Sequence, residues 1–147
     1  MVTFLLDIIT PQRNVYSQDV DMLTVPTAKG TVGILAHHAP LFSALTEGEL
    51  KITVGSKEYF LAVGGGFMEV TGKSVQVLVS RAYHADELNE AEIKRAREKA
   101  KEAIAEGVKG QDLAVAQAIL RRSFIELKVF RRKRVHTAFN NFPISKS

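Results

Sequence analysis

Residues 48–79 read GELKITVGSKEYFLAVGGGFMEVTGKSVQVLV, and apolar and polar side chains alternate in four short runs of this stretch. Such alternation is typical of β-strands that bury one face, so we predict strands at residues 50–54, 58–63, 67–71 and 74–79. Gly55-Ser56 and Gly72-Lys73 separate neighbouring runs, and glycine accepts the positive φ that tight hairpin turns require. Consecutive hairpins of this kind predict an antiparallel sandwich or barrel.

The residues before this stretch continue the same pattern. Phe4, Leu6 and Ile8 alternate with other residues, and a further strand is expected at residues 15–25. The run Gly64-Gly65-Gly66 lacks the Gly-x-x-x-x-Gly-Lys-Ser/Thr pattern of a phosphate loop and precedes a strand rather than a helix. We therefore interpret it as a bulge or a site of tight backbone packing.

The hydrophobic period changes near Asp86, where Ala, Glu, Lys and Arg replace strand-forming residues. Asn89 and Glu92 have the spacing of a capping box, so a helix is expected from this point to about Glu106. The residues predicted to form its inner stripe are Ile93, Ala96, Ala100, Ala103 and Ile104.

A second helix is expected after a short glycine-containing loop. Gly107 and Gly110 should end the first helix, and Asp112 is a suitable cap for a second that runs to about Arg134. Two helices joined in this way form an antiparallel hairpin. The apolar stripe predicted for the second helix consists of Leu113, Ala116, Leu120, Phe124, Leu127 and Phe130.

The predicted organisation is a β + α chain, with a β-rich head at residues 1–85, a helical arm at residues 86–135 and a loose tail at residues 136–147. Charge is distributed unevenly between these parts. The head is near neutral, whereas nine basic residues from Gly107 onward face only Asp112 and Glu126. Such an arm can bind nucleic acid, an anionic membrane surface or an acidic protein groove, and charge alone does not select among them.

Composition argues against several classes of protein. The chain has no cysteine, which excludes disulfides, a cysteine nucleophile and cysteine-ligated zinc. Its apolar runs are shorter than a membrane-spanning helix, and its first residues lack the basic lead-in of a signal peptide. We therefore expect a chain that is neither secreted nor embedded in a membrane.

Candidate catalytic and metal-binding residues do not form a recognised pattern. Ser17, Ser43 and Ser80 lie outside any Gly-x-Ser-x-Gly setting. His37 and His38 are adjacent, so on an extended chain they would point to opposite faces, and no third ligand has a suitable spacing. We expect no catalytic residue and no metal site in this chain.

The order of several motifs adds a further indication. Gly33-Ile34-Leu35 precedes His38-Ala39-Pro40-Leu41, then Gly48-Glu49-Leu50, then Gly65-Gly66-Phe67-Met68-Glu69-Val70, then Val75-Gln76-Val77-Leu78. In this order they resemble the motifs of the epsilon subunit of rotary F-type ATP synthases. Lys94-Arg95-Ala96 and Leu120-Arg121-Arg122 extend the resemblance into both helices, whereas Ala36-His37 and Ser80-Arg81 depart from the family pattern.

The resemblance implies a ten-stranded antiparallel β-sandwich followed by a two-helix antiparallel hairpin. It also implies that the head docks on the gamma subunit and the c-ring, and that the extended arm contacts the alpha and beta subunits and inhibits ATP hydrolysis. The chain would then be a non-catalytic central-stalk subunit of a proton-translocating enzyme. It would lie peripherally at the cytoplasmic face of a bacterial cell membrane, with the thylakoid membrane as the alternative. The rival hypothesis is a nucleic-acid-binding module that uses the basic second helix.

The resemblance also implies roles for individual residues. Thr31 and His38 are expected on the c-ring side. The basic face expected to meet the alpha, beta and gamma subunits in the extended state consists of Arg121, Arg122, Lys128, Arg131 and Arg132. Gly107 and Gly110 are the hinge candidates, because a hinge must absorb large changes in φ and ψ.

Some bacterial relatives bind ATP on the folded arm through an Ile/Leu-Asp-x-x-Arg-Ala motif and further arginines. Arg95 and Arg122 correspond to family positions, but Glu92 replaces the aspartate, and Glu102 and Glu126 stand at two expected arginine positions. A carboxylate near a polyphosphate replaces attraction with repulsion. We therefore expect weak or absent ATP binding and no cofactor.

Overall fold

The computed structural model describes residues 2–135 of the 147-residue chain. The tail predicted at residues 136–147 lies outside the described residues. Within them, ten strands precede a short 3-10 helix and two α-helices. The elements are β1 (Phe4–Ile9), β2 (Asn14–Val20), β3 (Met22–Thr27), β4 (Gly30–Leu35), β5 (Leu41–Leu45), β6 (Gly48–Val54), β7 (Lys57–Val63), β8 (Gly66–Val70), β9 (Ser74–Val79), β10 (Ala82–His84), η1 (Ala85–Glu87), α1 (Glu90–Ala105) and α2 (Gly110–Val135).

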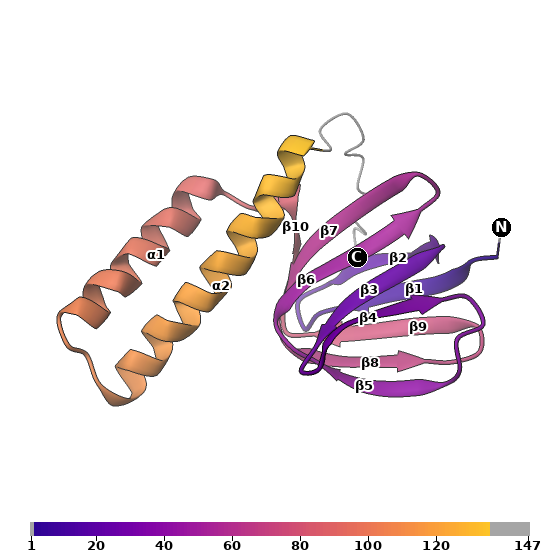
Figure 1. The fold of residues 1–147 in the computed structure, drawn as a ribbon, viewed down its shortest axis with the longest axis horizontal. Helices are drawn as coiled ribbons and strands as arrows, with labels where there is room; N and C mark the ends of the chain where they lie inside the picture. The colour runs from indigo at the N-terminus through magenta and orange to yellow at the C-terminus, as the bar shows by residue number, and fades with distance from the viewer. Residues whose placement is uncertain (1, 136–147) are drawn as a thin grey trace.

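The strands form two five-stranded sheets packed as a sandwich, with the two helices to one side (Figure 1). One sheet has the strand order β2-β1-β9-β8-β5, and the other has the order β10-β7-β6-β3-β4. We call them the first and the second sheet. The paired strands are antiparallel except for β1 and β9, which are parallel. The choice between sandwich and barrel is therefore resolved as a sandwich, and the strand count implied by the resemblance is confirmed.

The strand predicted at residues 15–25 is in fact two strands that belong to different sheets. β2 pairs with β1 in the first sheet, whereas β3 pairs with β4 and β6 in the second. The prediction was wrong because both strands bury some of their apolar residues in the same core, so the pattern continues across the change of sheet at Asp21. Alternation does not predict β4 and β5, since these strands lie at sheet edges and bury only one residue each.

Inward-facing side chains of the two sheets build one hydrophobic core. Leu6, Ile8, Leu50, Ile52 and Met68 have no exposed surface. They come from strands of both sheets, so each sheet stabilises the other by removing apolar area from water. The alternation that predicted the strands therefore also selected core residues correctly.

Asn89 caps the N-terminus of α1, which is the first half of the predicted capping box. The Asn89 side chain accepts a hydrogen bond from the backbone N–H of Glu92 at 3.1 Å. A reciprocal capping box lies one turn earlier, where the His84 side chain accepts from the η1 backbone and the Glu87 carboxylate accepts from the His84 N–H at 3.0 Å. Two successive caps thus define the route from the head into the arm.

The C-terminus of α1 is a Schellman motif built on Gly107. Gly107 has φ 87°, and its N–H donates to the carbonyl of Ile104 at 3.0 Å. The N–H of Val108 donates to the carbonyl of Ala103 at 3.3 Å. α2 begins at Gly110, so the prediction that Asp112 caps this helix is wrong. Asp112 lies in the first turn, where its charge still complements the helix dipole.

The buried faces of the helices differ from the predicted stripes at two positions. Ala96 is exposed, and Arg97 lies half-buried between Ile93 and Ala100 on the inner face of α1. Phe124 was expected inside the hairpin but is 71% exposed. Its prediction was wrong because α2 contacts α1 on one side and the second sheet on another, and Phe124 lies on neither side.

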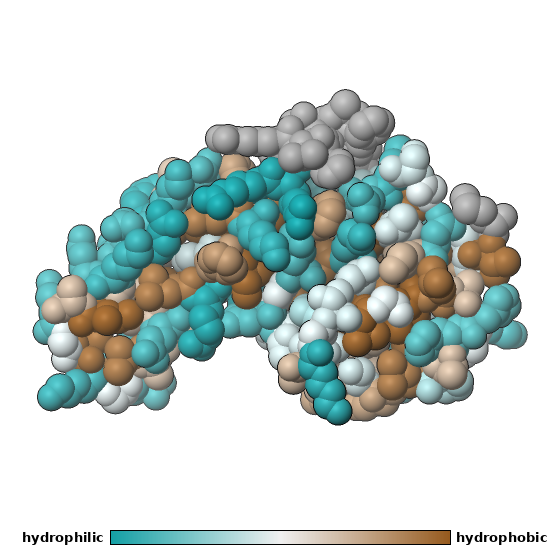
Figure 2. Space-filling view, in the orientation of Figure 1, coloured by the Kyte–Doolittle hydropathy of each residue, from teal (hydrophilic) through white to brown (hydrophobic). Residues whose placement is uncertain are grey.

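α2 lies between α1 and the sandwich (Figure 1). Val129 of α2 is fully buried and clusters with Phe60 and Ala62 of β7 and with Ala85 of η1. Figure 2 shows hydrophobic side chains gathered in the seam between the helices, whereas much of the outer helix surface is hydrophilic. The arm is therefore packed against the head in this structure.

We predict that Gly66→Ala strongly destabilises the head. A methyl group on Gly66 would overlap the carbonyl oxygen of Leu78 and lie 2.7 Å from the Cα of Val79, and backbone atoms of a paired strand cannot move aside cheaply. The free energy of unfolding should fall by about 3 kcal/mol in urea denaturation, a value typical of severe overpacking. Gly72→Ala is the matched control, since nothing lies within 4 Å of its added methyl group, and equal stability of the two variants would contradict the prediction.

Candidate interaction surfaces

The outer face of the first sheet carries a row of apolar residues. Ile9, Leu78, Phe67 and Ala44 are successive cross-strand neighbours on β1, β9, β8 and β5. We call this set the apolar row. Phe67 is 50% exposed and Leu78 is 44% exposed, so the row is open to solvent across four strands.

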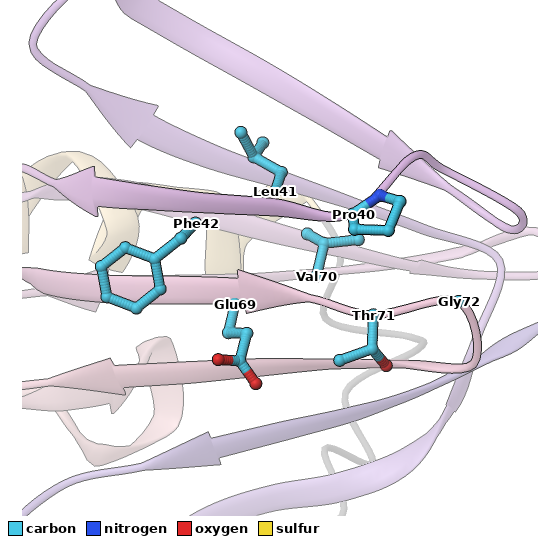
Figure 3. A pocket seen from close by; sticks show the side chains of 7 residues that line it. All are labelled: Pro40, Leu41, Phe42, Glu69, Val70, Thr71 and Gly72. Carbon is cyan, nitrogen blue, oxygen red and sulfur yellow. The ribbon is translucent and has the colours of Figure 1, made fainter.

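Phe42 of β5 extends the apolar row. Its ring stacks on that of Phe67, with centroids 5.5 Å apart, and it is 65% exposed. Figure 3 shows Phe42 and Glu69 on one side of β5 and β8, and Leu41 and Val70 on the other. The seven residues drawn there line an open pocket of about 560 Å³ beside the row.

The apolar row has the character of a docking surface. Contiguous exposed apolar side chains on a folded chain mark places where another molecule binds. Our sequence reasoning missed the row because it followed only the buried alternation. The signal was present at Phe67 and Leu78, which are large and apolar although their neighbours Met68 and Val77 occupy the inward positions.

The second sheet holds the arm through charged contacts as well as through Val129. The guanidinium of Arg132 donates two hydrogen bonds to the carboxylate of Glu49, at 3.1 and 3.0 Å, and lies 4.6 Å from the centre of the Phe60 ring. The hydrogen bond with Glu49 raises the pKa of Arg132. Bidentate geometry and the aromatic face make this the better-defined of the arm's charged contacts.

A second charged contact lies at the turn between β5 and β6. Glu47 accepts a hydrogen bond from Arg121 of α2 at 3.1 Å and another from Arg81 of the head at 3.0 Å. Arg121 remains 61% exposed, so solvent weakens this pair. We call Glu47, Glu49, Arg121 and Arg132 the charge latch.

The other basic residues predicted on the arm have different environments. Arg122 pairs with Glu126 on the same helix at 3.4 Å, and the Glu126 side chain is only 12% exposed. Lys128 and Arg131 are exposed. The structure therefore does not bring the five predicted residues to one site: two bind the head, one binds α2 itself, and two face solvent.

The positions that resemble an ATP site do not form a basic pocket. Glu92 and Arg95 are exposed on α1, and Glu102 is exposed near its end. Arg122 is already paired with the carboxylate of Glu126. Its positive charge is thus partly neutralised within the chain.

Thr31 and His38, expected together on one side of the head, lie near opposite ends of β4. Thr31 lines a cleft with Lys128 and Arg132, whereas His38 follows the strand and its Nδ1 lies 2.7 Å from the Ala39 carbonyl. The adjacent histidines lie in the turn and loop after β4, where His37 is exposed and has φ 63°. The hinge candidates Gly107 and Gly110 both have positive φ, at 87° and 61°.

Two searches of the described residues give negative results. No helix in residues 2–135 is long and apolar enough to cross a membrane. Within the same residues, no group of three or more His, Asp or Glu side chains is arranged to hold a metal ion.

Comparison with known proteins identifies the family. Residues 3–85 match the family model described as the β-sandwich domain of the ATP synthase Delta/Epsilon chain. The ATP synthase epsilon chain of Dehalococcoides mccartyi is 42% identical over 137 residues, which cover 92% of this chain and 98% of that protein. The sodium ion specific ATP synthase epsilon chain of Propionigenium modestum is 32% identical, over 88% of this chain and 94% of its own length.

The fold of this chain is also similar to that of one chain in a solved assembly. A chain of the Euglena gracilis mitochondrial ATP synthase superposes with a TM-score of 0.65 at 20% identity, covering 92% of this chain and 81% of that one. At this identity the match concerns the fold alone. The family model and the close relatives go further, and by them this chain belongs to the ATP synthase epsilon chain family.

Proposed function

We propose that this chain is a non-catalytic central-stalk subunit of a rotary F-type ATP synthase, in which the head couples gamma to the c-ring and the arm inhibits ATP hydrolysis. The observation that supports this most directly is the separation of two surfaces. The apolar row lies on the first sheet, whereas the arm packs on the second. The arm can therefore leave the head without disturbing whatever the row binds.

In this proposal the apolar row binds gamma, and one end of the head faces the c-ring. Exposed Phe67, Phe42 and Leu78 are the side chains best suited to a lasting apolar interface. We assign the His38 end of β4 to the c-ring. Thr31 lies near the other end of the strand, beside the arm, so a single contact surface at one end of the head does not include both residues.

The arm is the regulatory part of the proposal, with residues 1–85 as the docking unit and residues 86–135 as the movable one. The apolar contact around Val129 is small, and Arg121 of the charge latch is largely exposed. A few kcal/mol of new contacts can therefore shift the arm to an extended state, with Gly107 and Gly110 as the hinge of the hairpin. In that state Arg121, Arg122, Lys128, Arg131 and Arg132 meet acidic segments of the alpha and beta subunits.

The proposal includes location, coupling ion and nucleotide. The chain associates peripherally, through the complex, with the cytoplasmic face of a bacterial membrane, and the complex translocates protons. ATP does not control the arm, since Arg122 already pairs with Glu126, and Glu102 and Glu126 stand at two positions where the resemblance implies arginines. We do not assign nucleic acid as a partner, because the arginines of α2 that reach the head bind carboxylates there.

Truncation after Ala85 should leave assembly intact and raise ATP hydrolysis by the complex. The head keeps its whole β-sandwich core, whereas the inhibitory arm is absent. The measurement is steady-state ATP hydrolysis of a complex stripped of this subunit and rebuilt with the full-length or the truncated chain. Retention of the truncated chain with unchanged hydrolysis would show that the arm is not inhibitory.

The double change Glu47→Gln and Glu49→Gln should act in the opposite direction and strengthen inhibition. It removes both carboxylates of the charge latch, so the folded arm loses about 0.5 kcal/mol per pair, about 1 kcal/mol in total, and the population of released arms rises about fivefold. Hydrolysis by the rebuilt complex should fall, and hydrogen exchange at α2 backbone amides of the isolated chain should accelerate.

Glu98→Gln is the control for the latch variant, because the ion pairs of Glu98 within the described residues are with Arg97 and Lys101 of its own helix. It should leave both measurements unchanged. Accelerated exchange without stronger inhibition in the latch variant would mean that the released arm does not inhibit.

Phe67→Ser should weaken binding of the head to isolated gamma by about tenfold, a loss typical of an aromatic anchor in an interface. Leu35→Ser is the control, since Leu35 is also an apolar strand residue and is 59% exposed, but lies on the second sheet. Calorimetric titration of gamma checks the prediction. Equal affinity of the wild-type chain and the Phe67 variant, both folded by circular dichroism, would exclude the apolar row as the gamma surface.

A further inference from the structure

Phe124 is the most exposed of the large hydrophobic residues described for this chain, at 71% of its surface. It lies in the middle of α2, a helix whose other large apolar residues mostly contact α1 or the head. An aromatic ring exposed to water lacks the stabilising free energy that it would gain if it were buried. The folded arm therefore leaves one large apolar side chain without a place to pack.

Four residues adjoin Phe124 one turn away on the helix surface, of which two are basic, Arg121 and Lys128, and two are apolar, Leu120 and Leu127. Arg121 precedes it by three residues, Lys128 follows by four, and Arg131 follows by seven, so all share its face. These three residues are exposed as well. The result is an exposed aromatic ring with Arg121 and Lys128 on one side and the less exposed Leu120 and Leu127 on the other.

Such a face complements a particular surface chemistry. A partner must offer an apolar cleft for the ring and carboxylates around its edge for the three cations. Ion pairs of this kind already form between α2 and the head. Arg121 already binds the carboxylate of Glu47, and Arg132, one position beyond this face, binds Glu49.

A nucleic acid is a less suitable occupant of the same face. Single-stranded nucleic acids bind successive aromatic side chains on which neighbouring bases stack. Phe124 is the single aromatic residue between Asp112 and Val129, so no such series exists here. Carboxylates of a protein partner fit the observed contacts of α2 better.

We infer that Phe124 is an aromatic anchor that inserts into an apolar cleft of an acidic protein partner when the arm leaves the head. This rests on the proposed inhibitory function and adds a specific side chain to it. Insertion excludes water from the ring edge, which strengthens the ion pairs of Lys128 and Arg131 with the partner. Release from Glu47 frees Arg121 for the same partner, so head and partner compete for one guanidinium.

The test compares Phe124→Ala with Val115→Ala, in the full-length chain. Val115 is also an exposed apolar residue of α2, at 48%, and lies about half a turn away from the Phe124 face, nine residues earlier. Each variant is titrated into ATP synthase complexes stripped of this subunit, with hydrolysis and retention measured separately. Phe124→Ala should weaken inhibition by about tenfold with unchanged retention, whereas Val115→Ala should behave as wild type.

Further variants separate the possible explanations. Phe124→Leu should recover most of the inhibition if burial in a cleft matters, and Phe124→Ala combined with Lys128→Ala should lose less than the product of the single losses, because the two contacts are coupled. Wild-type inhibition by Phe124→Ala, while truncation after Ala85 abolishes inhibition, overturns the anchor and leaves the inhibitory arm standing. Absence of any effect of the truncation overturns the proposed function itself.

Two other occupants of this face give distinct results. A monomer–dimer equilibrium of the isolated chain that Phe124→Ala abolishes, with inhibition unchanged, would mean that a second copy covers the ring. Binding of a single-stranded oligonucleotide that Phe124→Ala abolishes, again with inhibition unchanged, would mean that nucleic acid does. Either result contradicts the acidic protein partner.

Discussion

Val129 of α2 packs with no exposed surface against Phe60 and Ala62 of β7, and the relation of the arm to the head depends on this small contact. The cluster around it contains four buried residues, against twenty-one in the core of the sandwich. The apolar area removed from water increases with the number of buried residues. The head is therefore stable by itself, while the arm is held weakly. A subunit whose arm moves and whose head stays bound needs this inequality.

The strand β7 is where the two parts meet. Its residues from Tyr59 to Val63 are all buried, because the sandwich core covers one face of the strand and α2 with η1 covers the other. A continuous apolar run is typical of a strand covered on both sides. The prediction that the strand at residues 58–63 buries only one face was therefore wrong, because α2 and η1 cover its second face.

Electrostatics adds a competition to this packing. The charge latch uses Arg121, which belongs to the basic helix face that an acidic partner would bind, and Arg132, which lies one position beyond that face. The guanidinium of each arginine can form its hydrogen bonds with carboxylates of the head or with carboxylates of a partner, but not fully with both. Since exposed ion pairs contribute only about 1 kcal/mol or less, neither state is locked, and modest changes in contact shift the balance.

Local patterns in the sequence determined much of this protein. Alternation and turn glycines predicted β1 and β6 to β9, Asn89 and Gly107 predicted the ends of α1, and the basic bias of α2 left its partner open. These signals depend on residues a few positions apart. Tertiary structure alone decided the change of sheet between β2 and β3, the position of α2 over β7 and the exposure of Phe124. It also decided the pairing of Arg121 with Glu47 and of Arg132 with Glu49, which are 74 and 83 residues apart. No local period specifies such contacts, because they follow from how complete elements pack.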